Sequence, residues 1–185
     1  MKKLVKKLIA GMLLAGVCAS AAACGAKGGG GEDASGRTNV RIAYFPNITH
    51  TQALVMKNQK TLEEKWKDQC NVTWTSFNAG PAEMEAIFAG EIDLGYIGPV
   101  PALSANVKSE GDVQIISNTT NAGAVFLKRK DAGISSLSDL AGKKIAVPQM
   151  GNTQHLCLLS ILSDQGLKTV DAGGDVTVNA SSNAD

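Results

Sequence analysis

Two glycine-containing turns carry the residues of this chain that are best placed to do chemistry. They are Gly98-Pro99-Val100-Pro101 and Gly151-Asn152-Thr153-Gln154, and each follows an apolar strand-like run and precedes a helix-like run. The first turn of a helix has unpaired backbone N–H groups and the positive end of the helix dipole. A glycine beside it lets the backbone come close to a ligand. Together, the two turns predict a seat for a small oxyanion.

Further polar residues lie at the predicted junctions between elements. Open α/β sheets bind ligands at the edge where strands give way to helices, and the first such junction holds Asn47, Thr49, His50, Thr51 and Gln52. Among these we expect Thr51 and Gln52 to contact the ligand, whereas His50 either donates to an anion or lies at the rim. Near a predicted crossing between two lobes, Asn121 would line the floor of the cleft, and Gly123 would line it or act as a hinge.

The elements that must position these residues alternate between strand and helix. Apolar and β-branched runs predict strands, and capping residues with Pro or Gly at the expected ends predict helices. The expected strands are residues 39–45, 72–77, 92–97, 113–117, 124–128, 144–147 and 176–178, and the expected helices are residues 52–67, 81–89, 99–107, 136–140 and 153–165. This βαβαβ order favours parallel pairing in a layered α/β sheet. We place a lobe boundary near Gly123, with a first lobe at residues 38–122 and part of a second lobe at residues 123–185.

The N-terminal segment is typical of a secretory signal. Four lysines precede an apolar run at residues 8–17, and small residues follow at 19–23. The run is too short for an ordinary membrane span, and its flanks are those of a cleaved signal. We therefore expect residues 1–23 to be removed and the mature protein to work outside the cytoplasm.

Cys24 decides whether the mature protein is anchored to the membrane. The residues Ala21-Ala22-Ala23-Cys24-Gly25 resemble the bacterial lipoprotein processing site, at which the Cys becomes the lipid-bearing N-terminus. Ordinary cleavage after an Ala-x-Ala triplet is the alternative. Cys18 is a weaker candidate for lipidation because β-branched Val17 precedes it. Residues 24–37 are rich in Gly and polar residues, which predicts a flexible, lipid-anchored tether on the extracytoplasmic side.

Composition excludes several classes of partner and site. The formal net charge is +1 and 19% of residues are charged, without a basic stripe, so we expect no nucleic-acid partner. Aromatic residues make up 4% of the chain, which is few for a site that stacks carbohydrate. Cys70 and Cys157 are interpreted as small buried hydrophobes rather than a disulfide. His50 and His155 are isolated, so we expect no metal site, and we interpret Asp93 as a structural acid.

Two longer stretches carry a family resemblance. Residues 77–99, FNAGPAEMEAIFAGEIDLGYIGP, and residues 139–154, DLAGKKIAVPQMGNTQ, closely resemble the nitrate, taurine and aliphatic sulfonate class of ABC importer substrate-binding proteins. The resemblance extends over residues 40–185. It implies an α/β, periplasmic-binding-protein-like (type II) fold, with two lobes of mostly parallel sheets flanked by helices. Because the chain stops at Asp185 inside the second lobe, we interpret that lobe as incomplete and the chain as C-terminally truncated.

The resemblance implies solute capture rather than a reaction. A small anionic solute would bind in the cleft between the lobes and shift them toward a closed form. ABC permease and ATPase subunits would then receive the solute from a monomeric binding protein that is not an enzyme and needs no cofactor. Aliphatic sulfonate is the first choice of solute, ahead of nitrate, taurine and thiamine-precursor pyrimidines. The ligand-binding residues that the resemblance supports are Thr51, Gln52, Gly98, Pro99, Asn121, Gly151, Asn152, Thr153 and Gln154.

Two alternative functions and one departure from the family pattern stay open. Pyrimidine-synthesising enzymes of thiamine biosynthesis share this fold, as do ligand-sensing modules of transcription regulators, but the secretory signal argues against both. Several relatives follow the Gly-Asn-Thr-Gln motif with an acidic residue and, one turn later, an Arg. This chain has His155 and Leu159 at those positions. The departure puts more of the expected binding on backbone amides.

Overall fold

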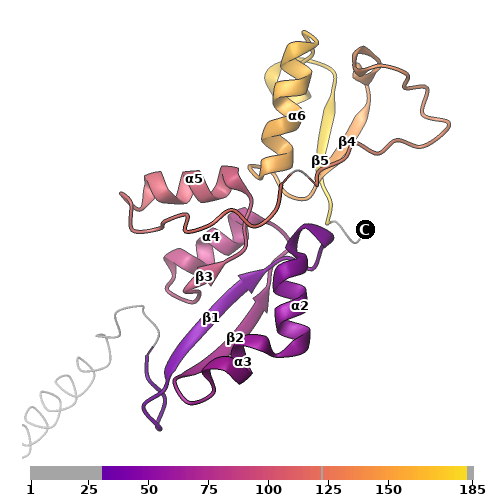
Figure 1. The fold of residues 1–185 in the computed structure, drawn as a ribbon. Helices are drawn as coiled ribbons and strands as arrows, with labels where there is room; N and C mark the ends of the chain where they lie inside the picture. Colours follow the sequence, from indigo (N-terminus) through magenta and orange to yellow (C-terminus); the bar gives the residue numbers. More distant parts are fainter. Residues whose placement is uncertain (1–30, 122, 183–185) are drawn as a thin grey trace, which may run out of the picture.

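The computed structural model describes residues 31–121 and 123–182 of the chain (Figure 1). Its first sheet contains β1 (Thr38–Tyr44), β2 (Cys70–Ser76) and β3 (Leu94–Gly95). The strand order is β2-β1-β3, and β1 pairs with both neighbours in parallel. The parallel α/β arrangement predicted from the sequence is therefore confirmed.

One predicted strand is shorter than expected and one predicted helix is broken. The strand expected at residues 92–97 is reduced to β3, because the turn that begins α5 follows it at once. The single helix expected at residues 52–67 is two helices, α2 (Thr51–Gln59) and α3 (Thr61–Trp66). Between them Lys60 has a φ of 53°, and its N–H donates back to α2, which ends α2 with a left-handed cap.

The side chains of β1 alternate between two packed faces of the first sheet. Tyr44 faces α2, where Lys57 Nζ donates to the Tyr44 hydroxyl at 2.9 Å. Ala43 faces the opposite way and packs in a small apolar cluster with Ala86 of α4 (Gly80–Phe88). Figure 1 shows α2 and α3 on one side of this sheet and α4 on the other.

The second sheet is smaller and belongs to a β-α-β unit. β4 (Lys144–Val147) and β5 (Thr177–Ala180) pair in parallel, and α6 (Thr153–Asp164) connects them. Two 3-10 helices, η3 (Leu137–Leu140) and η4 (Val170–Ala172), flank these elements, and η3 replaces the helix expected at that place. The core of the unit contains Leu140, Val147, Leu158, Leu162 and Val176.

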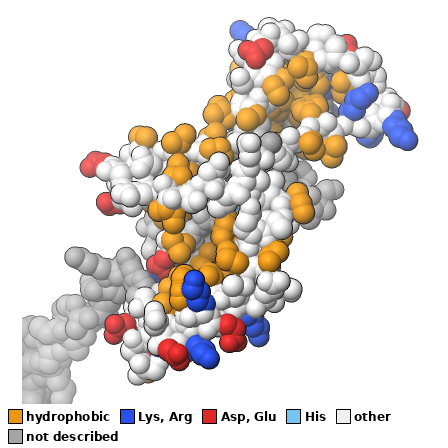
Figure 2. Space-filling view, in the orientation of Figure 1, with side chains coloured by type: hydrophobic (Ala, Val, Ile, Leu, Met, Phe, Trp, Pro, Cys, Tyr) orange, Lys and Arg blue, Asp and Glu red, His pale blue; other side chains and the backbone are white. Residues whose placement is uncertain are grey.

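The chain between the two sheets differs most from expectation. After α5 (Pro99–Lys108), the strands predicted at residues 113–117 and 124–128 are absent, so both predictions are wrong. Their apolar side chains are exposed, with Ile116 at 81% and Leu127 at 86%. Figure 2 shows exposed apolar side chains over several parts of one face of the molecule. A strand needs a hydrogen-bonded neighbour, and no described residue supplies one to these two runs.

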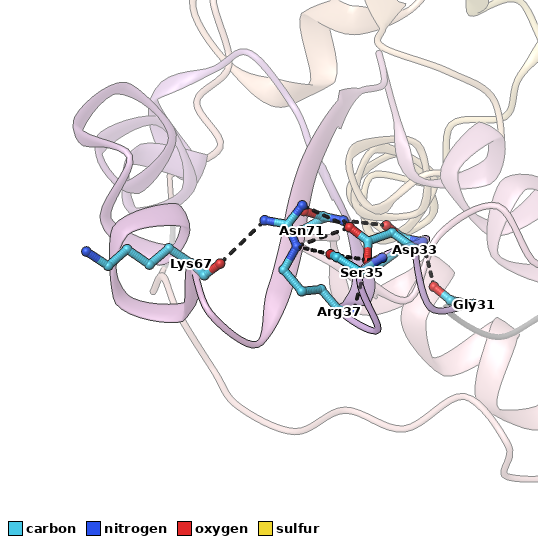
Figure 3. Close-up of polar contacts among 7 residues, drawn as sticks. Gly31, Asp33, Ser35, Arg37, Lys67 and Asn71 are labelled. Carbon is cyan, nitrogen blue, oxygen red and sulfur yellow. Dashed lines mark hydrogen bonds and ion pairs between the residues drawn. The ribbon is translucent and has the colours of Figure 1, made fainter.

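The chain reaches β1 through a compact polar network around Asp33 (Figure 3). The Asp33 carboxylate accepts hydrogen bonds from the Ser35 hydroxyl at 2.6 Å, from Asn71 Nδ2 at 2.6 Å and from Arg37 Nη2 at 2.8 Å. Arg37 also donates to the Lys67 carbonyl at 3.5 Å, just after α3. The hydrogen bond from Ser35, with those from the Arg37 N–H and from Asn71, lowers the pKa of Asp33 well below its ordinary value. The network joins the segment before β1 to β2.

The predicted signal at residues 1–23, Cys24 and residues 24–30 of the predicted tether at residues 24–37 lie outside the described residues. Within the described ranges, no helix is both long enough and apolar enough to cross a membrane.

Glu83 is a carboxyl group buried without a hydrogen-bonding partner. It lies on α4, is fully buried, and neither of its carboxyl oxygens accepts a hydrogen bond from a described residue. Its side chain occupies the space in front of Gly95 on β3, where a Cβ would overlap Glu83 Oε1. Burial raises the pKa of Glu83 from 4.5 to about 8. The folded protein therefore holds this group in its neutral form at neutral pH.

We expect Glu83 to make folding stability fall as the pH rises. The unfolded chain releases this proton near pH 4.5 and the folded chain near pH 8, so the contribution of Glu83 to the free energy of unfolding is complete below pH 4.5 and is lost as the pH rises toward 8. The decline should be on the order of a few kcal/mol. Glu83→Gln should remove most of this pH dependence, as measured by urea unfolding at several pH values. Glu85→Gln, on the exposed side of the same helix, is the control, and equal slopes for both variants would contradict the assignment.

Two glycines allow the starts of three helices to pack closely. A Cβ at Gly80, the first residue of α4, would overlap Pro101 of α5. A Cβ at Gly98, which precedes α5, would overlap the Thr153 hydroxyl at the start of α6. The φ of Gly98 is −71°, which any residue adopts, so the requirement for glycine is one of space.

Gly98→Ala should therefore push α5 and α6 apart. We expect a loss of about 1–3 kcal/mol in the free energy of unfolding, because the added methyl group overpacks a close contact. Thr153→Ala should recover part of that loss in the double variant, since the Thr153 Cβ alone would lie 3.3 Å from the new methyl group. Chemical denaturation of the four members of this mutant cycle gives the coupling. Purely additive losses would contradict the proposed overlap.

Candidate functional site

A small pocket lies where the carboxyl edge of the first sheet meets the start of α6. Its free volume is about 20 Å³, which is room for about one water molecule. Its walls come from the turns after β1, β2, β3 and β4 and from the first residues of α6. The lining residues are Phe45, Asn47, Asn78, Ala79, Gly80, Gly98, Pro101, Pro148, Asn152, Thr153 and Gln154.

Two lining residues at the start of α6 have free backbone N–H groups. Asn152 is the N-cap, and its Oδ1 accepts from the His155 N–H at 2.8 Å. The Gly151 N–H donates to His155 Nδ1 at 3.0 Å, so it is already in use. The N–H groups of Thr153 and Gln154 make no hydrogen bond to any described residue. These two amides lie at the positive end of the helix dipole, where an anion is stabilised.

The starts of α4 and α5 differ in how many donors they supply. In α4 the N–H groups of Gly80 and Ala82 have no hydrogen-bonding partner among the described residues. In α5 the prolines at positions 99 and 101 lack an N–H, so Val100 is the sole orphan donor of that turn. The Val100 N–H donates to Thr153 Oγ1 at 3.4 Å. The donors left free therefore come from α4 and α6.

Two asparagine side chains add neutral donors to the pocket wall. Asn47 Oδ1 accepts from the Thr49 N–H at 3.1 Å and from the Thr49 hydroxyl at 2.6 Å, so its NH2 group is left to donate. Asn152 is 3% exposed, and the hydrogen bond at its Oδ1 orients it in the same way. No Lys, Arg, His, Asp or Glu is among the lining residues. The arrangement can hold oxygen acceptors, but it supplies no acid, base or nucleophile of the usual kinds.

The structure brings together some of the residues predicted for the site. Gly98, Asn152, Thr153 and Gln154 line the pocket. The other predicted residues lie outside its lining, and they are Thr51, Gln52, Pro99, Asn121 and Gly151. Their role in binding stays a prediction.

Gln52 forms hydrogen bonds with the segment between α5 and η3, which leads from the first sheet to the second and is called the crossing segment here. Its Nε2 donates to the Thr119 carbonyl at 2.5 Å and to the Thr120 hydroxyl at 3.3 Å. The Thr120 hydroxyl in turn donates to the Thr49 carbonyl at 2.7 Å. These bonds fasten the start of the crossing segment to the start of α2.

Sequence reasoning missed the turn between β2 and α4. Asn78, Ala79 and Gly80 line the pocket, yet none of them was among the expected ligand contacts. The signal that could have found them was present, because this turn also follows a strand and precedes a helix with Pro in its first turn. The carboxyl ends of parallel strands share one edge of the sheet.

The two histidines have structural roles. His50 is buried, its ring stacks on Phe45 with centroids 4.4 Å apart, and its Nδ1 accepts from the Phe45 N–H at 3.1 Å. Burial lowers the pKa of His50 to about 4, so it is neutral at physiological pH. His50 therefore supports the pocket wall from behind rather than lying at a rim. His155 holds the turn before α6 in place through Gly151.

The remaining expectations concern cysteines and an acid. Cys70 and Cys157 are both free; Cys70 is only partly buried and Cys157 is exposed, so the interpretation of the two as buried residues is wrong. Asp93 is structural, as expected, because it accepts from Arg41 Nε at 2.9 Å and from Arg41 Nη2 at 2.6 Å. Among the described residues, no three His, Cys, Asp or Glu side chains gather as metal ligands would.

Comparisons with known proteins agree with this architecture. The model of the NMT1-like family matches residues 33–183. The chain is 29% identical over 172 residues to a putative aliphatic sulfonates-binding protein of Escherichia coli K12, covering 92% of this chain and 49% of the relative. It is 30% identical over 132 residues to the taurine-binding periplasmic protein of the same strain, covering 70% of this chain and 39% of the relative.

A solved structure shows the same fold. The alkanesulfonate-binding protein SsuA from Xanthomonas axonopodis pv. citri, bound to MOPS, matches with a TM-score of 0.59 and 27% identity, over 83% of this chain and 50% of that chain. The present chain thus spans about half the length of the relatives it matches. The family match covers most of the chain, and the parallel sheets flanked by helices agree with the solved relative. The chain belongs to the NMT1-like family and has the fold of the periplasmic binding proteins.

Proposed function

We propose that this chain is part of the extracytoplasmic solute-binding component of an ABC importer and that it captures a small sulfonate. The observation that carries the proposal is the pair of free amides of Thr153 and Gln154 at the start of α6. Both residues line a pocket that has neutral polar side chains and no charged ones. Such a site grips an anion without chemically changing it.

The absence of charged side chains among the lining residues favours a fully ionised monoanion. A sulfonate carries one negative charge over three oxygen acceptors and has no proton to place at neutral pH. A phosphate monoester brings close to a second negative charge at pH 7, and no lining side chain could balance it. Helix starts and amide NH2 groups are sufficient for the single charge of a sulfonate.

The size of the pocket supports capture by closure. A free volume of about 20 Å³ is too small for a sulfonate and its carbon chain. The walls must therefore part to admit a solute and close again around it. We place the two moving lobes at residues 38–122 and 123–185, with Gly123, which has a φ of 102°, at the hinge. A solute that binds the closed form more tightly shifts the population toward it.

The relatives support the choice of solute and of partners. The names of similar proteins refer to aliphatic sulfonates, taurine and alkanesulfonate. We infer the same class of ligand here, with aliphatic sulfonate ahead of taurine and nitrate, and delivery to a membrane permease with its ATPase. Those relatives are about twice as long as the stretch that this chain matches.

Asn152→Asp tests the proposed anion site. Aspartate is as good an N-cap as asparagine, so the fold should be kept, but it adds a negative charge to the pocket wall. We expect the affinity for ethanesulfonate and taurine to fall at least about tenfold, through charge repulsion. Isothermal calorimetry on the complete protein measures this change, and thermal unfolding checks the fold.

The matched control is Asn58→Asp, which adds the same charge on the exposed end of α2. It should leave the affinity unchanged. Binding by the Asn152→Asp variant with the original affinity would remove the pocket as the anion site. A lack of binding by the unaltered protein to sulfonates, taurine and nitrate alike would remove the proposed class of solute.

We further propose that Cys24 carries a lipid that holds the protein at the membrane. The support is the small-residue run before Cys24 and the Gly-rich segment after it. In a bacterial host, metabolic labelling with an alkyne fatty acid should mark the unaltered protein and the Cys18→Ser variant. Cys24→Ser should lose the label and leave the membrane fraction. Labelling that survives Cys24→Ser would place the anchor elsewhere.

A further inference from the structure

Thr153 joins the starts of two helices that belong to different sheets. It is the first residue of α6, and its hydroxyl oxygen accepts from the Val100 N–H of α5 at 3.4 Å. Gly98, the residue before α5, has no side chain in the space that the Thr153 hydroxyl occupies. Among the described residues the structure thus has two units, one formed by the first sheet with α2 to α5 and one formed by β4, α6 and β5. A side chain of the second unit, that of Thr153, caps α5 of the first unit.

The cap matters because α5 cannot cap itself. Its N-cap residue is Gly98, which has no side-chain acceptor. Pro99 and Pro101 have no N–H, and the Ala102 N–H already donates to the Gly98 carbonyl at 3.2 Å. Among the described residues, Thr153 is therefore the acceptor for the one orphan donor of this turn.

A second hydrogen bond crosses between the same two units. Asn78 Nδ2, in the turn after β2, donates to the Pro148 carbonyl, just after β4, at 3.1 Å. All four groups, from Asn78, Pro148, Thr153 and the turn at Gly98, lie in or beside the wall of the pocket. The described residues on either side of position 122, including Gly123, form no helix or strand where the chain crosses between the units. Separation of the units would break both bonds.

We propose that Thr153 is a closure residue, whose hydroxyl caps α5 only when the two units are together and so stabilises the closed pocket. The inference deepens the proposed solute capture and depends on it for its purpose, but the cap itself involves no solute. When the units part, Val100 and Thr153 bond to water instead. One net hydrogen bond corresponds to about a two- to tenfold change in the closed-to-open ratio, and the 3.4 Å separation places this bond toward the lower end of that range.

The test compares Thr153→Val with Thr153→Ser in the complete protein. Valine keeps the shape of threonine and loses the acceptor, whereas serine keeps the acceptor. One spin label is placed on the exposed Cys157 of α6 and a second on α5, at the exposed position 104 through Ser104→Cys, with the other cysteines replaced by serine. Double electron–electron resonance between the two labels measures the distance between α5 and α6. Thr73→Val, on an exposed position of β2, is the matched control for the same atomic change.

We expect Thr153→Val to move about two- to tenfold more of the population to longer distances without solute, and Thr153→Ser and Thr73→Val to match the unaltered protein. An unchanged distance distribution in the valine variant would overturn the proposal. So would a serine variant that opens as much as the valine variant, because the methyl group and not the hydroxyl would then be responsible.

Calorimetry with taurine and ethanesulfonate separates this proposal from the proposed function. A distance shift in the valine variant, together with no binding of sulfonates by the unaltered protein, supports closure by Thr153 and overturns the solute class. Sulfonate binding of equal affinity in the valine and unaltered proteins, with equal distances, supports the solute class and overturns closure by Thr153.

Discussion

The close approach of three helix N-termini is the constraint from which the rest of the site follows. Each start carries a partial positive charge of about half an elementary charge, and like ends repel when they meet. Gly80 and Gly98 remove the steric barrier to that approach, but not the electrostatic one. The Thr153 hydroxyl offsets part of the repulsion at α5, and the Asn152 side chain does so at α6. What remains is a local excess of positive potential that an anion would relieve.

The pocket wall owes its donors to hydrogen bonds made outside it. An asparagine side chain has one acceptor and two donors, and its orientation is decided by whichever end is already bonded. At Asn47 and Asn152 the acceptor end is held by a nearby backbone N–H, which leaves the donor end free. His50 stacks on Phe45 of this wall and is neutral at physiological pH, so it adds no positive charge to the pocket. Local capping thus determines the polarity of a site built from distant parts of the chain.

Local signals in the sequence predicted more of this structure than long-range ones. Gly151 to Gln154 could be recognised as a helix start because capping depends on a few neighbouring residues. Gln52 was expected at the site, but a 3-10 turn at residues 48–50 precedes α2, and the Gln52 side chain bonds to Thr119 across the fold. Residues 113–117 and 124–128 have strong strand propensity, which no pairing partner among the described residues realises. Strand pairing and side-chain contacts between residues distant in sequence cannot be predicted from composition or from the spacing of motifs.

The network at Asp33 determines how mechanical load enters the domain. It ties the segment before β1 to the turn after α3 and to β2, at the amino edge of the first sheet. The pocket lies beyond the opposite edge, and seven residues of strand separate the two by roughly 20 Å. A pull on the preceding residues would be shared by the network and by two parallel strands loaded in shear. A load applied to the chain before β1 would therefore reach this network and the paired strands before it reached the helix starts around the pocket.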